Sequence, residues 1–514
     1  MYKSKAVKLI SIIISFSLLL SVLLIGCGNE KEEAVTGTTD TAPDTSAAQS
    51  TEKLDPAELT WCIMNSEQKD LDTVLKDINV YLQGKLNAKL NLEIYDWGQY
   101  DQKMQLKIAG GENFDLCFTT FSWVNKFQQN VTKGAFLPLD DLLENYGQNI
   151  KKIIPEKYIN MARVNGKIYA VPNYQITAMS KSIYFKKDLV DKYKFDYKSV
   201  TKMEDLEPLL DQILKNEKGM TPININKIWE GELYVYCKGY GVKFPDKVGP
   251  IEIYEDGKGG YTYSDQPSEA FKNYLRLMRK WYLKGYIRKD AASIDTDDSY
   301  MKAGKDAVMI GGTYKPGDDI DMSNKYGYPI VSQRVTEPVV QPGASLSACT
   351  AISATSENPE RAMMLLDLLN SDKVLFNKMV FGIKDRHYKQ IDENTVETIP
   401  DSGYKLDAWE FGNQFNSFYM KGQAPGTWEE TIKYNESAEL SPMAKINFIF
   451  DTEPVKTEWA KIQAISDEFM PSLTTGTVDP DKNLALMYEK LEPILPKLME
   501  EVKRQVEAAA KNNK

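Results

Sequence analysis

The chain has 514 residues, of which 42% are hydrophobic and 26% charged, a composition typical of a globular protein. Its net charge of -10 argues against nucleic acid as a partner, because that binding depends on clustered Lys and Arg. The single histidine, His387, argues against the commonest metal sites and against proton transfer through histidine, so carboxylate chemistry is the main catalytic option left.

The N-terminus has the features of a secretory signal. Three lysines precede an apolar run that extends from Leu9 to Ile25. The run ends in Leu24-Ile25-Gly26-Cys27, which resembles the lipobox of bacterial lipoproteins, where the cysteine receives a diacylglycerol. We therefore expect residues 1–26 to be a lipoprotein signal peptide and Cys27 to be the lipidation site. An ordinary signal peptide and a membrane-spanning helix are the alternatives.

The segment after Cys27 is predicted to be a flexible linker. Residues 28–53 contain one branched apolar residue and no aromatic residue, so they cannot bury enough surface to offset the entropy of ordering the chain. Beyond them no apolar run approaches the roughly 20 residues that a transmembrane helix needs. Residues 27–55 are thus expected to tether an extracellular body to the bacterial cell membrane through lipid alone.

The body opens with alternating strand and helix patterns. Strands are predicted at 58–64, 90–95 and 114–118, with helices starting near Asn65 and Gly98 between them. This alternation predicts an α/β fold with a mostly parallel sheet and helices on both faces. In such sheets ligands bind beyond the carboxyl ends of the strands, which here are residues 65–67 and 119–123.

The four remaining cysteines have no CxxC spacing. Buried free thiols are the simpler interpretation of Cys62, Cys117, Cys237 and Cys349. Because the first two lie in strands that are candidates for neighbours, a disulfide between Cys62 and Cys117 stays open.

Several blocks of the body carry a family resemblance. They are FDLCFTTFSWVNKFQQNVTKGAFLPLDDLLENYG at 114–147, VNGKIYAVPNYQ at 164–175, AGKDAVMIGGTY at 303–314 and LSACTAISATSENPERAMMLLDLLNSD at 346–372. These blocks resemble the extracellular solute-binding proteins of ABC importers, family 1, the carbohydrate-binding group. GIKDRHY, WEFGNQF and the C-terminal tail resemble its long LplA-type lipoprotein subgroup, so the resemblance covers nearly everything after residue 55.

The resemblance implies a two-lobe fold of the periplasmic-binding-protein type (type II), with discontinuous lobes joined by hinge strands. One lobe would comprise residues 56–172 plus 332–376, and the other residues 173–331 plus 377–512. The hinges would lie near Ala170–Tyr174 and Gly327–Ser332. The solute would be enclosed between the lobes, and its contacts would favour the closed state.

Sugars offer apolar faces to aromatic rings and hydroxyl groups to polar side chains. The family pattern and the positions of the strand ends together indicate a set of aromatic and polar residues as candidates for ligand binding. Packing within a lobe is the alternative for the aromatic residues, and turn formation or helix capping is the alternative for the polar ones. Glu67 has a second alternative, a favourable charge in the first turn of a helix. The candidates are Trp123, Tyr174, Trp229, Tyr314, Trp409, Glu67, Thr119, Thr120, Gln175, Thr313 and Asn413.

These features together predict a lipid-anchored receptor. It would capture an oligosaccharide and deliver it to an ABC permease with separate ATPase subunits, acting as a monomer without cofactor or catalysis. An extracellular carbohydrate-active enzyme is one alternative, although no GxxxxGK[ST], GxSxG, HExxH or SxxK motif is present. A peptide receptor or sensor partner is another. The acidic runs at 295–298 and 318–321 lack the EF-hand pattern, so solvated loops are favoured there over calcium sites.

Overall fold

The computed structural model describes residues 54–121, 123–227, 230–243, 245–294 and 298–512. Residues 1–53, with Cys27, and Trp229 lie outside the described residues. The described side chains form two main hydrophobic cores. Within these ranges, no helix combines the length and the apolar character needed to cross a membrane.

The first core is built on a five-stranded sheet with the strand order β2-β1-β3-β15-β6. The first three strands in the chain are parallel, as the alternation predicts, whereas β15 runs antiparallel to β3. Helices cover the sheet, and Trp61 to Met64 on β1 are fully buried, as expected for a strand covered on both faces. The elements are β1 (Ala57–Met64), α1 (Leu71–Leu86), β2 (Ala88–Tyr95), α2 (Tyr100–Gly110), β3 (Leu116–Thr119), α3 (Phe127–Thr132), α4 (Asp140–Tyr146), α5 (Gln148–Ile153), α6 (Glu156–Ile159), β4 (Arg163–Val164), β5 (Lys167–Ile168), β6 (Val171–Pro172), β15 (Cys349–Ile352) and α13 (Pro359–Ser371).

Helix α1 begins at Leu71, later than the predicted start near Asn65. Side-chain hydrogen bonds organise a loop instead: Asn65 Oδ1 accepts from the Ser66 N–H at 2.9 Å, and Gln68 Nε2 donates to the Ser66 carbonyl at 2.9 Å. Such local bonds compete with helical ones. Glu67 therefore lies outside the first turn of α1, and the helix-charge alternative for this residue is wrong.

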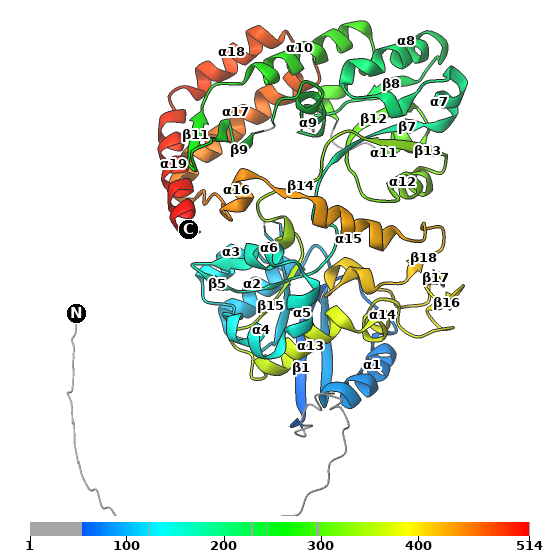
Figure 1. Ribbon diagram of the computed structural model, residues 1–514, viewed down its shortest axis with the longest axis vertical. Helices are drawn as coiled ribbons and strands as arrows, with labels where there is room; N and C mark the ends of the chain where they lie inside the picture. The colour runs from blue at the N-terminus through cyan, green and yellow to red at the C-terminus, as the bar shows by residue number, and fades with distance from the viewer. Residues whose placement is uncertain (1–53, 122, 228–229, 244, 295–297, 513–514) are drawn as a thin grey trace, which may run out of the picture. The chain divides into compact units, whose positions relative to one another are not determined.

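The second core surrounds a four-stranded sheet, β13-β7-β12-β8, and a three-stranded sheet, β11-β10-β9. Ile183 and Phe185 on β7 face this core, whereas Tyr184 between them packs with Met301 and Tyr326 in a smaller cluster on the other face. Figure 1 shows α10, α17 and α18 side by side, in agreement with their contacts. The elements are β7 (Lys181–Lys186), α7 (Lys187–Tyr193), α8 (Glu207–Asn216), β8 (Thr221–Asn224), α9 (Glu230–Gly239), β9 (Asp246–Val248), β10 (Ile251–Glu255), β11 (Tyr261–Ser264), α10 (Glu269–Lys284), α11 (Asp298–Lys302), β12 (Asp306–Thr313), α12 (Asp318–Tyr326), β13 (Ile330–Arg334), α16 (Pro442–Lys445), α17 (Lys456–Thr474), α18 (Pro480–Leu491) and α19 (Leu495–Asn512).

The chain passes between the two cores in three segments that lie side by side. Met179 and Val339 exchange two backbone hydrogen bonds of 2.8 Å, and β14 (Val339–Val340) pairs in parallel with β19 (Glu439–Leu440). The predicted hinges are therefore displaced. Residues 170–174 lie in the first core, where β6 pairs with β15, and residues 330–332 lie within β13 of the second sheet.

The segment from residue 377 to about 438 belongs to the first core, so its assignment to the second lobe is wrong. Helix α14 (Lys373–Phe381) follows α13 after a single residue and packs against α1. Phe411 then places its ring edge-on to Trp61, with the centroids 5.4 Å apart. The chain returns to the second core only after the third crossing. The elements of this segment are β16 (Tyr388–Gln390), β17 (Thr395–Thr398), β18 (Tyr419–Met420) and α15 (Thr427–Ser437).

The four described cysteines are free and buried. Cys62 and Cys117 occupy paired positions on the neighbouring strands β1 and β3, yet they form no disulfide. Burial raises the pKa of the Cys117 thiol to about 12, so this thiol stays protonated. The interpretation as structural thiols therefore holds in this structure.

The C-terminal helix should be required for the stability of the second core. Leu498 on α19 is fully buried, and Leu498→Ala should lower the free energy of unfolding by about 2–5 kcal/mol because it removes packed methyl groups. Urea unfolding followed by tryptophan fluorescence measures this loss. Leu486→Ala on α18 is the matched control, since Leu486 is 42% exposed. Equal losses in the two variants would contradict the assigned core.

Candidate functional site

The carboxyl ends of β1, β2, β3 and β6 meet at one edge of the first sheet. This follows from their pairing, because β6 and β3 both run antiparallel to β15 and β3 is parallel to β1 and β2. The loops that leave this edge carry Glu67, Trp97, Trp123 and Gln175. Residues 65–67 and 119–123 therefore share one edge, as predicted.

Three tryptophans form an aromatic surface at this edge, which we call the tryptophan platform. Trp97 and Trp123 are nearly parallel, with ring centroids 6.3 Å apart and an angle of 18° between the rings. The ring centroid of Trp409 lies 5.9 Å from that of Trp97 and 6.3 Å from that of Trp123. The Phe118 ring packs edge-on against Trp123 and Trp409. Trp97 is 40% and Trp123 45% exposed, so the platform offers ring faces to solvent. Such faces suit the apolar C–H patches of a sugar.

Thr119 and Thr120 shape the loop that presents Trp123. Both side chains are fully buried. The Thr119 hydroxyl donates to the Asn125 carbonyl, and the Thr120 hydroxyl donates to the Val124 carbonyl at 2.8 Å while accepting from the Val124 N–H at 3.0 Å. The prediction that these two hydroxyls contact the ligand is therefore corrected: they form the turn, as the alternative states.

A buried carboxyl group lies directly behind Trp409. Trp409 belongs to a short 3-10 helix, Ala408–Glu410, and Glu410 is fully buried. Asn65 Nδ2 donates to Glu410 Oε2 at 3.2 Å, whereas Oε1 has no partner among the described residues. Burial, reinforced by the charge of Asp407, raises the pKa of Glu410 to about 8, so this group is mostly protonated at pH 7.

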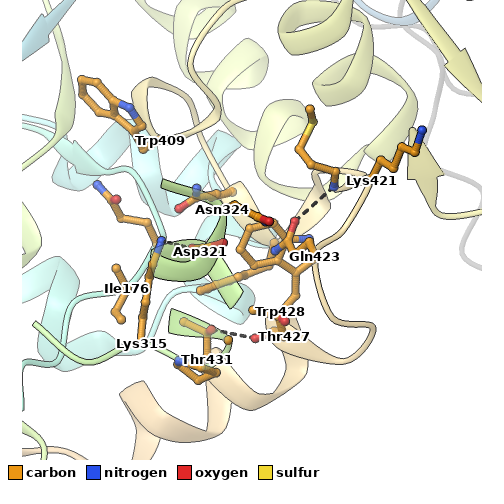
Figure 2. A pocket seen from close by; sticks show the side chains of 16 residues that line it. Ile176, Lys315, Asp321, Asn324, Trp409, Lys421, Gln423, Thr427, Trp428 and Thr431 are labelled. Atoms are coloured by element: carbon orange, nitrogen blue, oxygen red, sulfur yellow. Dashed lines mark hydrogen bonds and ion pairs between the residues drawn. The ribbon is translucent and has the colours of Figure 1, made fainter. Parts of the chain in front are cut away.

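A cavity of about 400 Å³ lies between segments of the two cores (Figure 2). One wall comes from the loop before α12 and from α12 itself, and the opposite wall comes from residues 409–431 of the first core. Trp409 borders both this interlobe cavity and the tryptophan platform. The cavity is lined by Gln175, Ile176, Lys315, Pro316, Gly317, Asp321, Asn324, Trp409, Gln414, Phe415, Met420, Lys421, Gln423, Thr427, Trp428 and Thr431.

The charged side chains of the cavity are paired. Lys315 Nζ lies 2.5 Å from Asp321 Oδ2, as Figure 2 shows, and Lys421 Nζ lies 2.7 Å from Glu397 Oε1. By contrast, the side-chain amides of Gln175, Asn324 and Gln414 have no hydrogen-bond partner within the described part of the chain. Neutral donors and acceptors are therefore the polar groups of this cavity that remain open to a ligand.

Two predicted ligand residues are buried inside the first core. Tyr174 is 4% exposed, and its ring lies edge-on to Phe415 at 4.9 Å. Asn413 is 7% exposed; its Nδ2 donates to the Asn370 carbonyl at 3.2 Å, and its Oδ1 accepts from the Phe415 N–H at 3.1 Å. Packing and capping explain both residues, so their assignment as ligand contacts is corrected.

The other candidates have more varied positions. Tyr314 is half-buried, with the Arg334 guanidinium 5.6 Å from its ring centroid and the Tyr434 ring 5.5 Å away. Thr313 ends β12, and only its backbone is described. Glu67 is exposed beside a separate open hollow of about 570 Å³.

The acidic run at 318–321 forms the first turn of α12 and not a solvated loop. Asp318 is 3% exposed and accepts hydrogen bonds from the Tyr184 hydroxyl at 2.8 Å and the Ser332 hydroxyl at 2.9 Å. No cluster of three or more His, Cys, Asp or Glu side chains suited to a metal ion occurs within the described ranges. Residues 295–297 lie outside those ranges.

The comparisons with known proteins agree with this architecture. Residues 68–375 match the family model described as bacterial extracellular solute-binding protein. This chain is a bacterial extracellular solute-binding protein. Residues 445–511 also match a domain of unknown function, DUF3502, which in this solute-binding protein contains α17, α18 and α19 of the second core.

Known relatives of this solute-binding protein include a carbohydrate ABC transporter substrate-binding protein from Streptococcus pneumoniae. The two are 30% identical over 457 residues, which cover 87% of this chain and 89% of the relative. The solved structure of the N-glycan transport solute-binding protein (NgtS) from the same species is 29% identical to this chain, with a TM-score of 0.75. The match covers 90% of this chain and 100% of the NgtS chain. Its complex with Man5GlcNAc is 28% identical, with a TM-score of 0.60 and coverage of 90% and 100%. These matches confirm the two-lobe α/β fold that the sequence predicts.

Several residues of the candidate site were not selected from the sequence. Trp97 follows β2 as Trp123 follows β3, so its position after a strand was an available signal. Trp428 also lies in a predicted loop or near a strand end but was not selected. Lys315 and Asn324 had no such signal, because they reach the cavity only after the chain has crossed between the cores.

Neutralising Glu410 should change how stability depends on pH. Because its pKa is raised to about 8, the folded protein keeps a proton that the unfolded chain releases above its ordinary pKa of 4.5. Stability should therefore fall as the pH rises from 5 towards 8, and Glu410→Gln should remove this fall. We expect the Tm advantage of the variant to widen by about 2 °C or more over that range in thermal-shift measurements. Glu500→Gln, on the exposed face of α19, controls for the loss of one carboxylate; the same widening there would contradict the assignment to Glu410.

Proposed function

We propose that this protein captures an oligosaccharide between its lobes outside the cell and delivers it to the permease of an ABC importer. The observation that carries the proposal is the tryptophan platform beside a cavity that offers unpaired amides. Aromatic faces and neutral polar groups together match the two chemical aspects of a sugar ring.

The relatives support a glycan of the N-linked type as the first candidate. One relative is named as a carbohydrate transporter component, and NgtS is described in complexes with Man1GlcNAc and Man5GlcNAc. The three crossing segments support capture by closure, because a few short strands between two cores are suited to a hinge movement.

The cavity favours binding over catalysis. Glycosidases of the usual kind need a pair of carboxyl groups beside the scissile bond. Among the described residues that line the cavity, Asp321 is the only carboxylate, and it is paired with Lys315. On this basis we infer a receptor and not a glycosidase. We further propose that it acts as a monomer without a cofactor and works with separate permease and ATPase subunits.

Removing a platform ring tests the proposed function. Trp409→Ala should weaken glycan binding by about 1–4 kcal/mol in isothermal titration calorimetry, because Trp409 borders both the platform and the cavity. The ligands are Man1GlcNAc, Man5GlcNAc, a panel of other neutral glycans and a peptide library. Tyr240→Ala, which truncates a 49% exposed aromatic residue beyond α9, should keep the wild-type affinity. Binding of peptides alone, or release of sugar products over time, would refute the receptor proposal.

We further propose that Cys27 carries the lipid anchor, on the basis of the signal sequence before it. Cys27→Ser should abolish lipid labelling in the producing bacterium, so that the protein is released or remains as the precursor. Metabolic labelling with a fatty-acid analogue, followed by cell fractionation, measures this change. Undiminished labelling of the variant would contradict the anchor.

A further inference from the structure

The candidate site has two parts that differ in enclosure. The platform residues Trp97 and Trp123 are 40% and 45% exposed. The interlobe cavity instead has walls from both sides. Lys315 and Asn324 belong to the loop before α12 and to α12, which packs against β13 of the second sheet, and Trp428 comes from α15 of the first core. Trp409 is the only described residue that belongs both to the three-ring platform and to the cavity lining.

The two parts also differ in chemistry. The indole N–H of Trp123 already donates to the Ser347 carbonyl at 3.2 Å, so this residue offers a ring face and no free donor. The cavity offers the unpaired amides of Gln175, Asn324 and Gln414. A sugar in the cavity is therefore recognised by its hydroxyl pattern, whereas a sugar on the platform is recognised mainly by its apolar face.

The size of the cavity limits how much of a glycan it holds. Its volume of about 400 Å³ is at the small end of the range for ligand pockets and suits about one or two sugar rings. A longer glycan must continue outside the cavity, and the platform is the aromatic surface that adjoins it at Trp409.

The charges of the cavity indicate a neutral ligand. Lys315 and Lys421 each already have a carboxylate partner, Asp321 and Glu397, so an anionic sugar would compete with that carboxylate for the cation. Arg334 lies outside the cavity lining, over the Tyr314 ring.

We propose that the site is divided into a terminal subsite and an extension subsite for a neutral glycan. The interlobe cavity takes one end of the glycan, and the tryptophan platform takes the sugars that follow, with Trp409 between them. This division rests on the proposed function. Its consequence is selection by length: a disaccharide uses the cavity, whereas a glycan of about four or more units gains affinity from the platform as well.

Calorimetric titration of the protein with Man1GlcNAc and Man5GlcNAc tests the division. Trp97→Ala should weaken Man5GlcNAc binding about tenfold or more, and at least fivefold more than it weakens Man1GlcNAc binding. Gln414→Ala, in the cavity, should weaken both glycans by a similar factor. Trp123→Phe is a milder platform variant with the same expected length dependence, and the Tm of each variant verifies folding.

Each outcome is decisive. Equal losses for the two glycans in both platform variants, with binding retained in the wild type, would overturn the division and leave the proposed function intact. If the wild type binds neither glycan, a neutral disaccharide and hexasaccharide from the panel that do bind take their place. Failure of every glycan would overturn the proposed function and the division together. An oligogalacturonate of six units should bind at least tenfold more weakly than the neutral six-sugar ligand, and equal binding would overturn the neutral class.

Discussion

The pairing of three chain crossings between the cores is the constraint on which the site depends. The hydrogen bonds between Met179 and Val339, and the pairing of β14 with β19, hold the three segments together. The cavity walls come from segments next to these crossings. Gln175 precedes the first crossing, and α15 precedes the third. Movement at the crossings would therefore act directly on the groups that line the cavity.

Asn435 shows how tightly one wall is tied to the hinge. This fully buried side chain, on α15, accepts from the Thr177 and Ala178 N–H groups at 2.9 and 3.1 Å and donates to the Gln175 carbonyl at 2.7 Å. One amide thus satisfies three backbone groups of the segment that leads into the first crossing. The α15 wall and the Gln175 wall are held as one unit on the first core, so the residues at 315–324 form the wall that a hinge movement would displace.

The tryptophan platform has exposed rings on one side and buried polar groups, which lower the stability of the fold, behind them. Large exposed aromatic surface is uncommon without a binding role, and here it is kept in place by buried polar groups. Thr120 and Thr119 fold the Trp123 loop back on itself, and Asn65 holds Glu410 behind Trp409. Burying a protonated carboxyl group with one unpartnered oxygen lowers the stability of the fold relative to a buried hydrocarbon side chain of the same size. This loss is consistent with a site in which stability is given up to hold a ring in a defined position.

The strand–helix alternation, the sheet edge with Trp123 and the family resemblance could all be predicted from the sequence, because they depend on local periodicity and contiguous blocks of residues. Which side chains come into contact depends on how distant segments pack, so it became visible only in the folded chain. Thr119 and Tyr174 match the family pattern but face inward, and Trp409 joins Trp97 and Trp123 from a distant part of the chain. Hydrophobic pattern shows that residues such as Val380 and Phe411 are buried, but it does not show in which of two cores. For that reason the hinges and the segment after residue 377 were misplaced, while the fold class was correct.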